Sequence, residues 1–195
     1  LGVSVPARYG GLGATYADLY PQKTGRLVLD GAIDPATTDF DVTLTQAKGF
    51  DSALAAYLAD CVTDDDCPFT SVQQRLTRIA QLFAQMDESP LPGDDGRQFG
   101  VNAMFWATIL PLYNQDNWPY LDQLFTDLLQ GDTRVGFLLA DSYNERNEDG
   151  TFASNSTEAF LSINCLDYQG GSDVATMRTE AAQLAAEAPV FGPWM

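Results

Sequence analysis

Residues 27–35 of the chain read LVLDGAIDP, and this stretch decides the fold of the amino-terminal part. It begins within an apolar run, residues 26–30, whose length is typical of a buried parallel strand. Residues 1–4, LGVS, form a second strand-like segment, and residues 12–20 carry a helical pattern that ends at Pro21. The order strand, helix, strand therefore predicts two strands, at residues 1–4 and 26–30.

After Pro35 the apolar residues recur at helical spacing almost to the end of the chain. We expect helices at about residues 44–58, 72–86, 99–110, 118–128, 132–143, 157–167 and 172–188. Between them, the polar segments 89–96 and 144–156 predict loops. Seven helices with two strands do not make a complete doubly wound sheet. The predicted fold class is mainly α, with a partial α/β remnant at the amino-terminal end.

The composition limits the class of protein. A chain of 195 residues with 45% hydrophobic residues is long enough for one packed domain. The net charge is −17 with only 10 lysines and arginines, so no nucleic-acid partner is expected. No apolar run approaches the roughly 20 residues that a membrane span needs. No metal or other cofactor is expected, because the chain has no histidine and no calcium-loop spacing.

Several segments are similar in sequence, and in their order along the chain, to segments of one known family. They are YGGLGA at residues 9–14, LVLDGAIDP at 27–35, CVTDDDCPF at 61–69, LYNQDNWP at 112–119, GDTRVGFLLADSY at 131–143 and INCLD at 163–167. Together they resemble the secreted tripeptidyl-aminopeptidase-like serine peptidases of actinobacteria, which have the α/β-hydrolase fold. The resemblance implies a peptide substrate, which is cleaved near a free N-terminus through an acyl-enzyme, and a secreted or cell-envelope location in a bacterium.

The resemblance also implies a division of the chain. Residues 1–35 correspond to part of the α/β-hydrolase core, residues 36–188 to a helical cap (lid) domain, and residues 189–195 to the start of the return to the core. The catalytic acid and histidine of the family follow the cap, so the chain is expected to be a fragment. The remainder of the hydrolase domain is then an expected partner.

Ser4 is the candidate nucleophile, in the segment GVSVP at residues 2–6. A nucleophile elbow reads G-x-S-x-G, because the serine occupies a tight strand-to-helix turn. Gly2 fits this pattern and Pro6 does not, and a second alignment places the nucleophile position on Arg8. If Ser4 attacks, the amide of Val5 is the expected oxyanion donor. The alternative is that Ser4 is an ordinary serine at the end of a strand.

No residue in the chain can serve as the usual base, because there is no histidine. Lys23 and Lys48, the only lysines, are weak candidates for a Ser-Lys pair. Asp30 and Asp34, at the end of the second strand, either reach a histidine supplied from elsewhere or cap the turn. The chain alone is expected to be inactive. The alternative function is a non-catalytic helical cap-like module that binds a peptide or a protein.

The cysteines allow three interpretations. Cys61 and Cys67 could form a disulfide, remain free thiols or bind a metal, and the family resemblance favours the disulfide. The same resemblance implies that Cys165 is unpaired in this chain.

Two kinds of residue could contact a substrate. By the resemblance, Asn164 and Asp167 lie where the cap of the family approaches the active site. The aromatic residues either line a pocket or fill the core: Phe105, Trp106, Tyr113, Trp118 and Tyr120.

Overall fold

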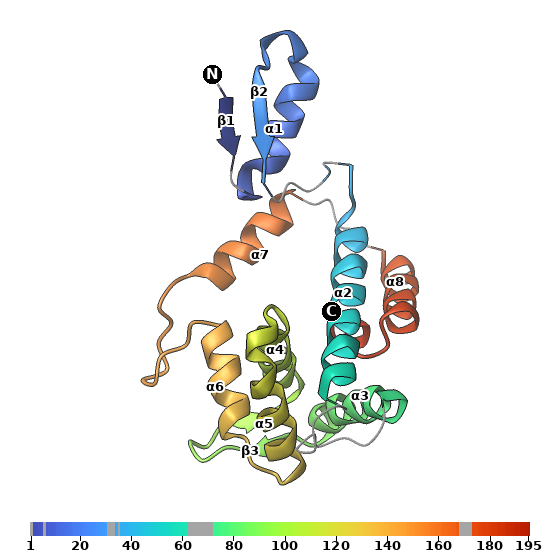
Figure 1. The fold of residues 1–195 in the computed structure, drawn as a ribbon, viewed down its shortest axis with the longest axis vertical. Helices are drawn as coiled ribbons and strands as arrows, with labels where there is room; N and C mark the ends of the chain where they lie inside the picture. Colours follow the sequence, from blue (N-terminus) through green and yellow to red (C-terminus); the bar gives the residue numbers. More distant parts are fainter. Residues whose placement is uncertain (1, 6, 31–33, 35, 62–71, 168–172) are drawn as a thin grey trace. The chain divides into compact units, whose positions relative to one another are not determined.

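The structure is a computed structural model that describes residues 2–5, 7–30, 34, 36–61, 72–167 and 173–195 (Figure 1). Side chains are described for these residues except 2–10, 72, 73 and 167. The chain divides into two compact units, Leu1–Val42 and Thr43–Met195, and each is described by itself. The domain boundary expected after residue 35 stays a prediction.

The first unit contains strand β1 (Gly2–Val5), helix α1 (Ala7–Leu19), the short helix η1 (Pro21–Lys23) and strand β2 (Arg26–Leu29). The two strands pair in parallel, with Gly2 opposite Arg26 and Val5 opposite Leu29. The prediction of two strands is confirmed. Helix α1 begins five residues earlier than predicted, because three glycines with low helix propensity made its first half resemble a turn.

A parallel pair of strands joined through a helix is a βαβ unit, which occurs in many α/β proteins. It therefore does not identify a hydrolase core, and that assignment stays a prediction. Several apolar side chains of this unit are exposed, among them Leu12, Leu19 and Val28. Two strands and one helix are too few to bury them.

The second unit is helical, which confirms the mainly α class. Its helices are α2 (Asp39–Cys61, beginning just before the unit boundary), α3 (Val72–Glu88), α4 (Val101–Leu112), α5 (Trp118–Leu129), α6 (Arg134–Tyr143), α7 (Ser156–Asp167) and α8 (Val174–Glu187), with a 3-10 turn η2 (Gln115–Asn117) and a last turn η3 (Gly192–Trp194). Helix α5 begins at Trp118 with proline in its first turn, as predicted, and Gly131 follows it with a φ of +81°.

Residues 89–96 are not entirely a loop, which corrects the prediction. Strand β3 (Leu91–Pro92) pairs antiparallel with β4 (Gln98–Phe99), and the turn between them passes through Gly96 at a φ of +82°. Strands of two residues are too short to produce an alternating pattern, so no periodicity predicts them.

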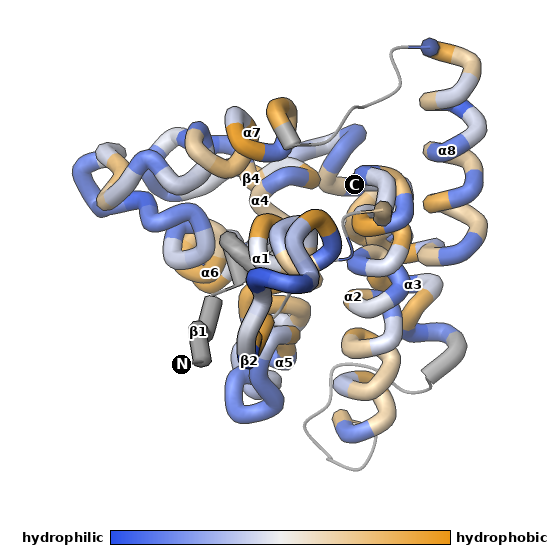
Figure 2. The backbone as a smooth tube through the Cα atoms, turned by 90° about the horizontal axis from the view of Figure 1, so that it is seen from above, coloured by the Kyte–Doolittle hydropathy of each residue, from blue (hydrophilic) through white to orange (hydrophobic). Residues whose placement is uncertain are grey.

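Aromatic and aliphatic side chains from most helices of the second unit form one core. The largest fully buried side chains include Tyr57, Phe83, Phe99, Phe125 and Phe191. Gly136 of α6 leaves room for the Phe99 ring, since a Cβ atom there would lie 2.5 Å from it. Figure 2 shows the contrast with the loop between α6 and α7, which is hydrophilic.

The segment after α8 is anchored in this core. Phe191 is 0% exposed, and its ring lies 5.7 Å from that of Phe50 and 5.6 Å from that of Phe83. The Asp51 carboxylate of α2 accepts the backbone N–H groups of Val190 and Phe191 at 3.2 and 3.0 Å. The assignment of residues 189–195 to the hydrolase core stays a prediction.

Replacing Asp51 by alanine is expected to lower the free energy of unfolding by about 2 kcal/mol, because two partly buried N–H groups lose their hydrogen-bond acceptor. Burial raises the pKa of Asp51 above 3.8, although its two backbone hydrogen bonds lower it. The folded protein therefore holds this proton more tightly than the unfolded chain. The contribution of Asp51 to stability is greatest below pH 3.8 and falls as the pH rises through the raised pKa.

Urea unfolding at several pH values measures this effect, with Asp87→Ala, an exposed position on α3, as the control. A wild-type minus Asp51→Ala difference that grows between pH 4 and pH 7 contradicts the prediction.

Candidate functional site

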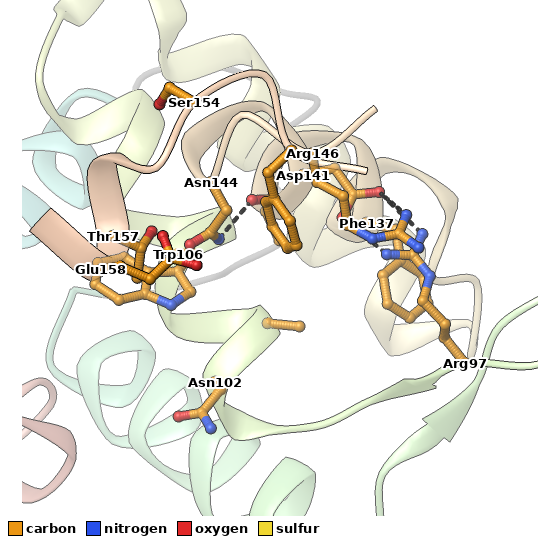
Figure 3. A pocket seen from close by; sticks show the side chains of 13 residues that line it. Arg97, Asn102, Trp106, Phe137, Asp141, Asn144, Arg146, Ser154, Thr157 and Glu158 are labelled. Carbon is orange, nitrogen blue, oxygen red and sulfur yellow. Dashed lines mark hydrogen bonds and ion pairs between the residues drawn. The ribbon is translucent and has the colours of Figure 1, made fainter. Parts of the chain in front are cut away.

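A cavity of about 310 Å³ opens among α4, α6, the start of α7 and the loop between α6 and α7 (Figure 3). Its lining is Arg97, Asn102, Ala103, Trp106, Phe137, Ala140, Asp141, Asn144, Arg146, Phe152, Ser154, Thr157 and Glu158. We call it the α4–α6 cavity. Its lining combines aromatic rings with charged groups, as ligand sites generally do, and its volume is at the lower end of their range.

One side of the cavity carries a closed ion network. The Arg97 guanidinium donates to both carboxylate oxygens of Asp141, at 2.8 and 2.9 Å, and to Asp95 at 2.5 Å. A nitrogen of Arg146 lies 3.6 Å from the same Asp141 carboxylate. The Arg97 guanidinium also covers the Phe137 ring at 4.0 Å. Both arginines of the lining are thus engaged with carboxylates, and the hydrogen bonds to Asp141 raise the pKa of Arg97.

An aromatic surface forms another side of the cavity. The Trp106 indole stacks on the Tyr143 ring, with centroids 4.5 Å apart and planes 20° apart. Burial is the larger of two causes that raise the pKa of Tyr143 to about 12, and a hydrogen bond with Tyr113 is the other. This phenol therefore stays neutral at physiological pH and cannot act as a base there. Phe152, which is 57% exposed, contributes a further ring at the rim.

The loop 144–155 forms the rim and is held by backbone hydrogen bonds within the loop and to the end of α6. The N–H of Asn147 donates to the carbonyl of Thr151 at 2.8 Å, and the N–H of Ala153 donates to that of Glu145 at 2.8 Å. Hydrogen bonds between nearby residues of this kind fix the conformation of a surface loop. They position the rim residues that the loop provides to the cavity.

The candidate nucleophile lies in strand β1. The backbone of Ser4 is opposite Val28 and that of Val5 is opposite Leu29, and α1 begins at Ala7. The side chains of Ser4 and Val5 are outside the described part of the chain, so their catalytic roles stay predictions.

Of the two residues expected near a substrate, Asn164 is not in the lining of the cavity. The Asn164 side chain donates to the carbonyl of Phe160 at 2.8 Å, so its amide is engaged by its own helix. Asp167 is the last residue of α7, and its side chain is not described. Of the five aromatic candidates, Trp106 lines the cavity. Phe105 is buried in the core.

Glu158 lines the cavity and was not predicted. An acidic residue in the first turn of a helix is common because it interacts favourably with the helix dipole, so its presence carried no functional signal. Only the tertiary structure, which brings the first turn of α7 to the cavity, reveals it (Figure 3).

The lysines and the aspartates after β2 have ordinary roles where they are described. Lys48 forms an exposed ion pair with Glu187 at 2.8 Å, and the Lys23 ammonium lies 5.5 Å from the Tyr20 ring centroid. The carboxylate of Asp34 accepts the N–H of Ala36 at 2.9 Å, which is the turn-capping alternative.

Cys61 ends α2, and its sulfur lies 3.3 Å from a carboxylate oxygen of Asp122. Cys67 lies outside the described residues, so the Cys61–Cys67 disulfide stays a prediction. Cys165 is free and exposed, as predicted. Within the described ranges, no three His, Cys, Asp or Glu side chains are grouped to hold a metal ion. None of the described helices is both long and apolar enough to cross a membrane.

Peptide mapping by mass spectrometry without reductant is expected to recover Cys61 and Cys67 in one cross-linked peptide and Cys165 as a free thiol. The short spacing of the first two residues makes the bond geometrically accessible. Alkylation of the unreduced chain at Cys165 is the internal control. A peptide that links Cys165 to either other cysteine contradicts the assignment.

No protein-family profile matches the chain. It is 31% identical over 172 residues to serine protease Hip1 of Mycobacterium tuberculosis, a match that covers 83% of this chain and 32% of Hip1. It is 32% identical over 165 residues to carboxylesterase B of the same organism, which covers 84% of this chain and 32% of the relative. The chain is related to serine hydrolases.

A further relative is YuaR of Escherichia coli, which bears only a provisional name as a hydrolase. It is 26% identical over 123 residues, and the match covers 62% of the chain and 25% of YuaR. The chain thus spans about a third of the length of the Mycobacterium relatives. The names of the relatives support hydrolysis and differ in the bond that they imply, peptide or ester.

Proposed function

We propose that the chain is the helical, substrate-contacting part of a serine peptidase, together with a piece of its core. The peptidase resembles the tripeptidyl aminopeptidases, releases short peptides from free N-termini and is secreted or attached to the cell envelope. The observation that carries the proposal is the α4–α6 cavity, an aromatic site inside a chain related to serine hydrolases. Its size suits one side chain of a peptide.

In this proposal, Ser4 attacks the carbonyl carbon of the substrate, and the Val5 amide donates to the oxygen on which charge develops. The serine proton needs a base, and the chain contains no histidine. The base and the acid that orients it come from the remainder of the hydrolase. The helical unit contributes binding, since it holds the peptide through its side chains.

A second candidate is a non-catalytic helical module that binds a peptide or a protein. The whole sequence contains no histidine, which favours the non-catalytic module for the chain by itself. Fluorophosphonate labelling separates the two candidates, because the probe reacts with activated serines. A modified peptide that contains Ser4 supports the enzyme, and an unmodified chain supports the binding module.

Peptide binding tests what both candidates share. We expect N-acetyl-leucine amide to shift the NMR resonances of the Trp106 indole, and Phe152→Ser to weaken binding about tenfold, or 1.4 kcal/mol. Phe160→Ser is the matched control, because Phe160 is 66% exposed on α7 and is not in the lining. The proposal fails if no blocked amino acid shifts Trp106, or if Phe160→Ser weakens binding as much as Phe152→Ser.

A further inference from the structure

We infer that the α4–α6 cavity binds the guanidinium of an arginine side chain, between the Glu158 carboxylate and the rings of Trp106 and Phe152. This inference deepens the proposed function and rests on it for the source of the arginine, a peptide. It defines a residue preference, since the cavity then selects one kind of side chain. Glu158 is the specificity-determining residue.

The first argument is the charge balance of the lining. Asp141 is bound to Arg97 at 2.8 and 2.9 Å and lies 3.6 Å from Arg146, and together with Asp95 it balances the charges of the two arginines. The Asp95 carboxylate forms a second ion pair with Arg97. Glu158 forms no hydrogen bond or ion pair with any residue that the structure describes. It is the uncompensated charge of the cavity, and the ligand that complements it is a cation.

The second argument is position. Glu158 lies in the first turn of α7, at the end of the helix where a negative charge interacts favourably with the helix dipole. Figure 3 shows Glu158 beside Thr157 and Trp106, on the side of the cavity away from Arg97 and Arg146. A cation bound there meets the carboxylate and the indole without approaching the two arginines.

The third argument is the aromatic surface. A guanidinium is planar and weakly hydrated, so it stacks on aromatic rings better than an ammonium does. The cavity already contains this arrangement, because Arg97 lies 4.0 Å from the centroid of the Phe137 ring. Trp106 and the exposed ring of Phe152 line the same cavity as the Glu158 carboxylate and offer further aromatic surface to a cation.

Size and long-range charge agree with this assignment. A cavity of about 310 Å³ accommodates one long side chain and not a folded segment. The net charge of −17 attracts cationic ligands in general and lowers the affinity for anionic ones.

The test uses N-acetyl-arginine amide, which has no free amine or carboxylate and so presents only the side-chain cation. Its affinity for the chain is compared with those of N-acetyl-lysine amide and N-acetyl-leucine amide by NMR titration at low salt. We expect the arginine compound to bind about tenfold more tightly than the leucine compound, and the lysine compound to fall between them. The arginine preference is expected to decrease in 0.5 M NaCl.

Glu158→Gln is expected to remove the arginine preference and to leave the affinity for N-acetyl-leucine amide within twofold. Glu148→Gln makes the same change in net charge on the neighbouring loop, outside the lining, and is expected to keep the preference. The inference is overturned if arginine and leucine bind equally to the wild-type chain, or if both variants alter the preference alike. Those outcomes differ from the failure of the proposed function, in which none of the three compounds shifts Trp106.

Discussion

Aminoacyl and tripeptidyl anilides are expected to show no turnover by this chain alone. The proton of a serine nucleophile must be accepted by a base, and the sequence contains no histidine. Loss of a member of the triad leaves acceleration only on the order of 10³–10⁴ over water, which comes from binding and the oxyanion hole. Lys48 cannot easily replace the base, because it is paired with Glu187 at 2.8 Å.

The measurement is release of the anilide at micromolar enzyme over hours, with Ser4→Ala as the control. The wild-type chain and the variant are expected to be indistinguishable. Turnover by the wild-type chain that is absent in Ser4→Ala contradicts the prediction and means that another group accepts the proton. Lys23 and Lys48 are then the first residues to replace.

Replacing Phe191 by alanine is expected to lower the free energy of unfolding by about 3–5 kcal/mol. The ring is fully buried, and it contacts the rings of Phe50, Phe83 and Phe105 at centroid distances of 5.7, 5.6 and 6.0 Å. Its removal leaves a cavity lined by aromatic groups that cannot all move inward. The loss is a large part of the stability of a domain of this size.

Denaturant unfolding followed by tryptophan fluorescence measures this loss. Phe160→Ala is the matched control, since its ring is exposed on α7 and its removal is expected to change stability by no more than about 0.5 kcal/mol. Phe191→Leu is expected to recover part of the stability by filling part of the space. Equal effects of Phe191→Ala and Phe160→Ala would show that the last turn is not anchored in the core.

The long helices could be predicted from the sequence because each carries a clear apolar stripe and a recognisable start. Trp118-Pro119 marked the beginning of α5, and the stripe from Leu44 to Leu58 marked α2. The hairpin of β3 and β4 could not be predicted, because a strand of two residues has no periodicity. The beginning of α1 was misplaced because glycine is permitted in a helix and also typical of a turn.

The candidate site was only partly accessible to the same reasoning. Trp106 was expected either to line a pocket or to fill the core, and only the tertiary packing distinguishes the two. Glu158 was missed because its local role, an acid at the start of a helix, explains it completely. Asn164 was expected from a resemblance, but its side chain bonds to the carbonyl one helical turn earlier.

The hydrogen bonding of loop 144–155 has a consequence for how this protein can be redesigned. The hydrogen bonds from Asn147 to Thr151 and from Ala153 to Glu145 lie within the loop. Arg146, in contrast, contacts Asp141 of α6 through its side chain and its backbone N–H, so a replacement loop between α6 and α7 needs to keep this arginine. Grafting a different sequence of equal length would change the entrance to the cavity while the buried aromatic residues beneath it keep their places.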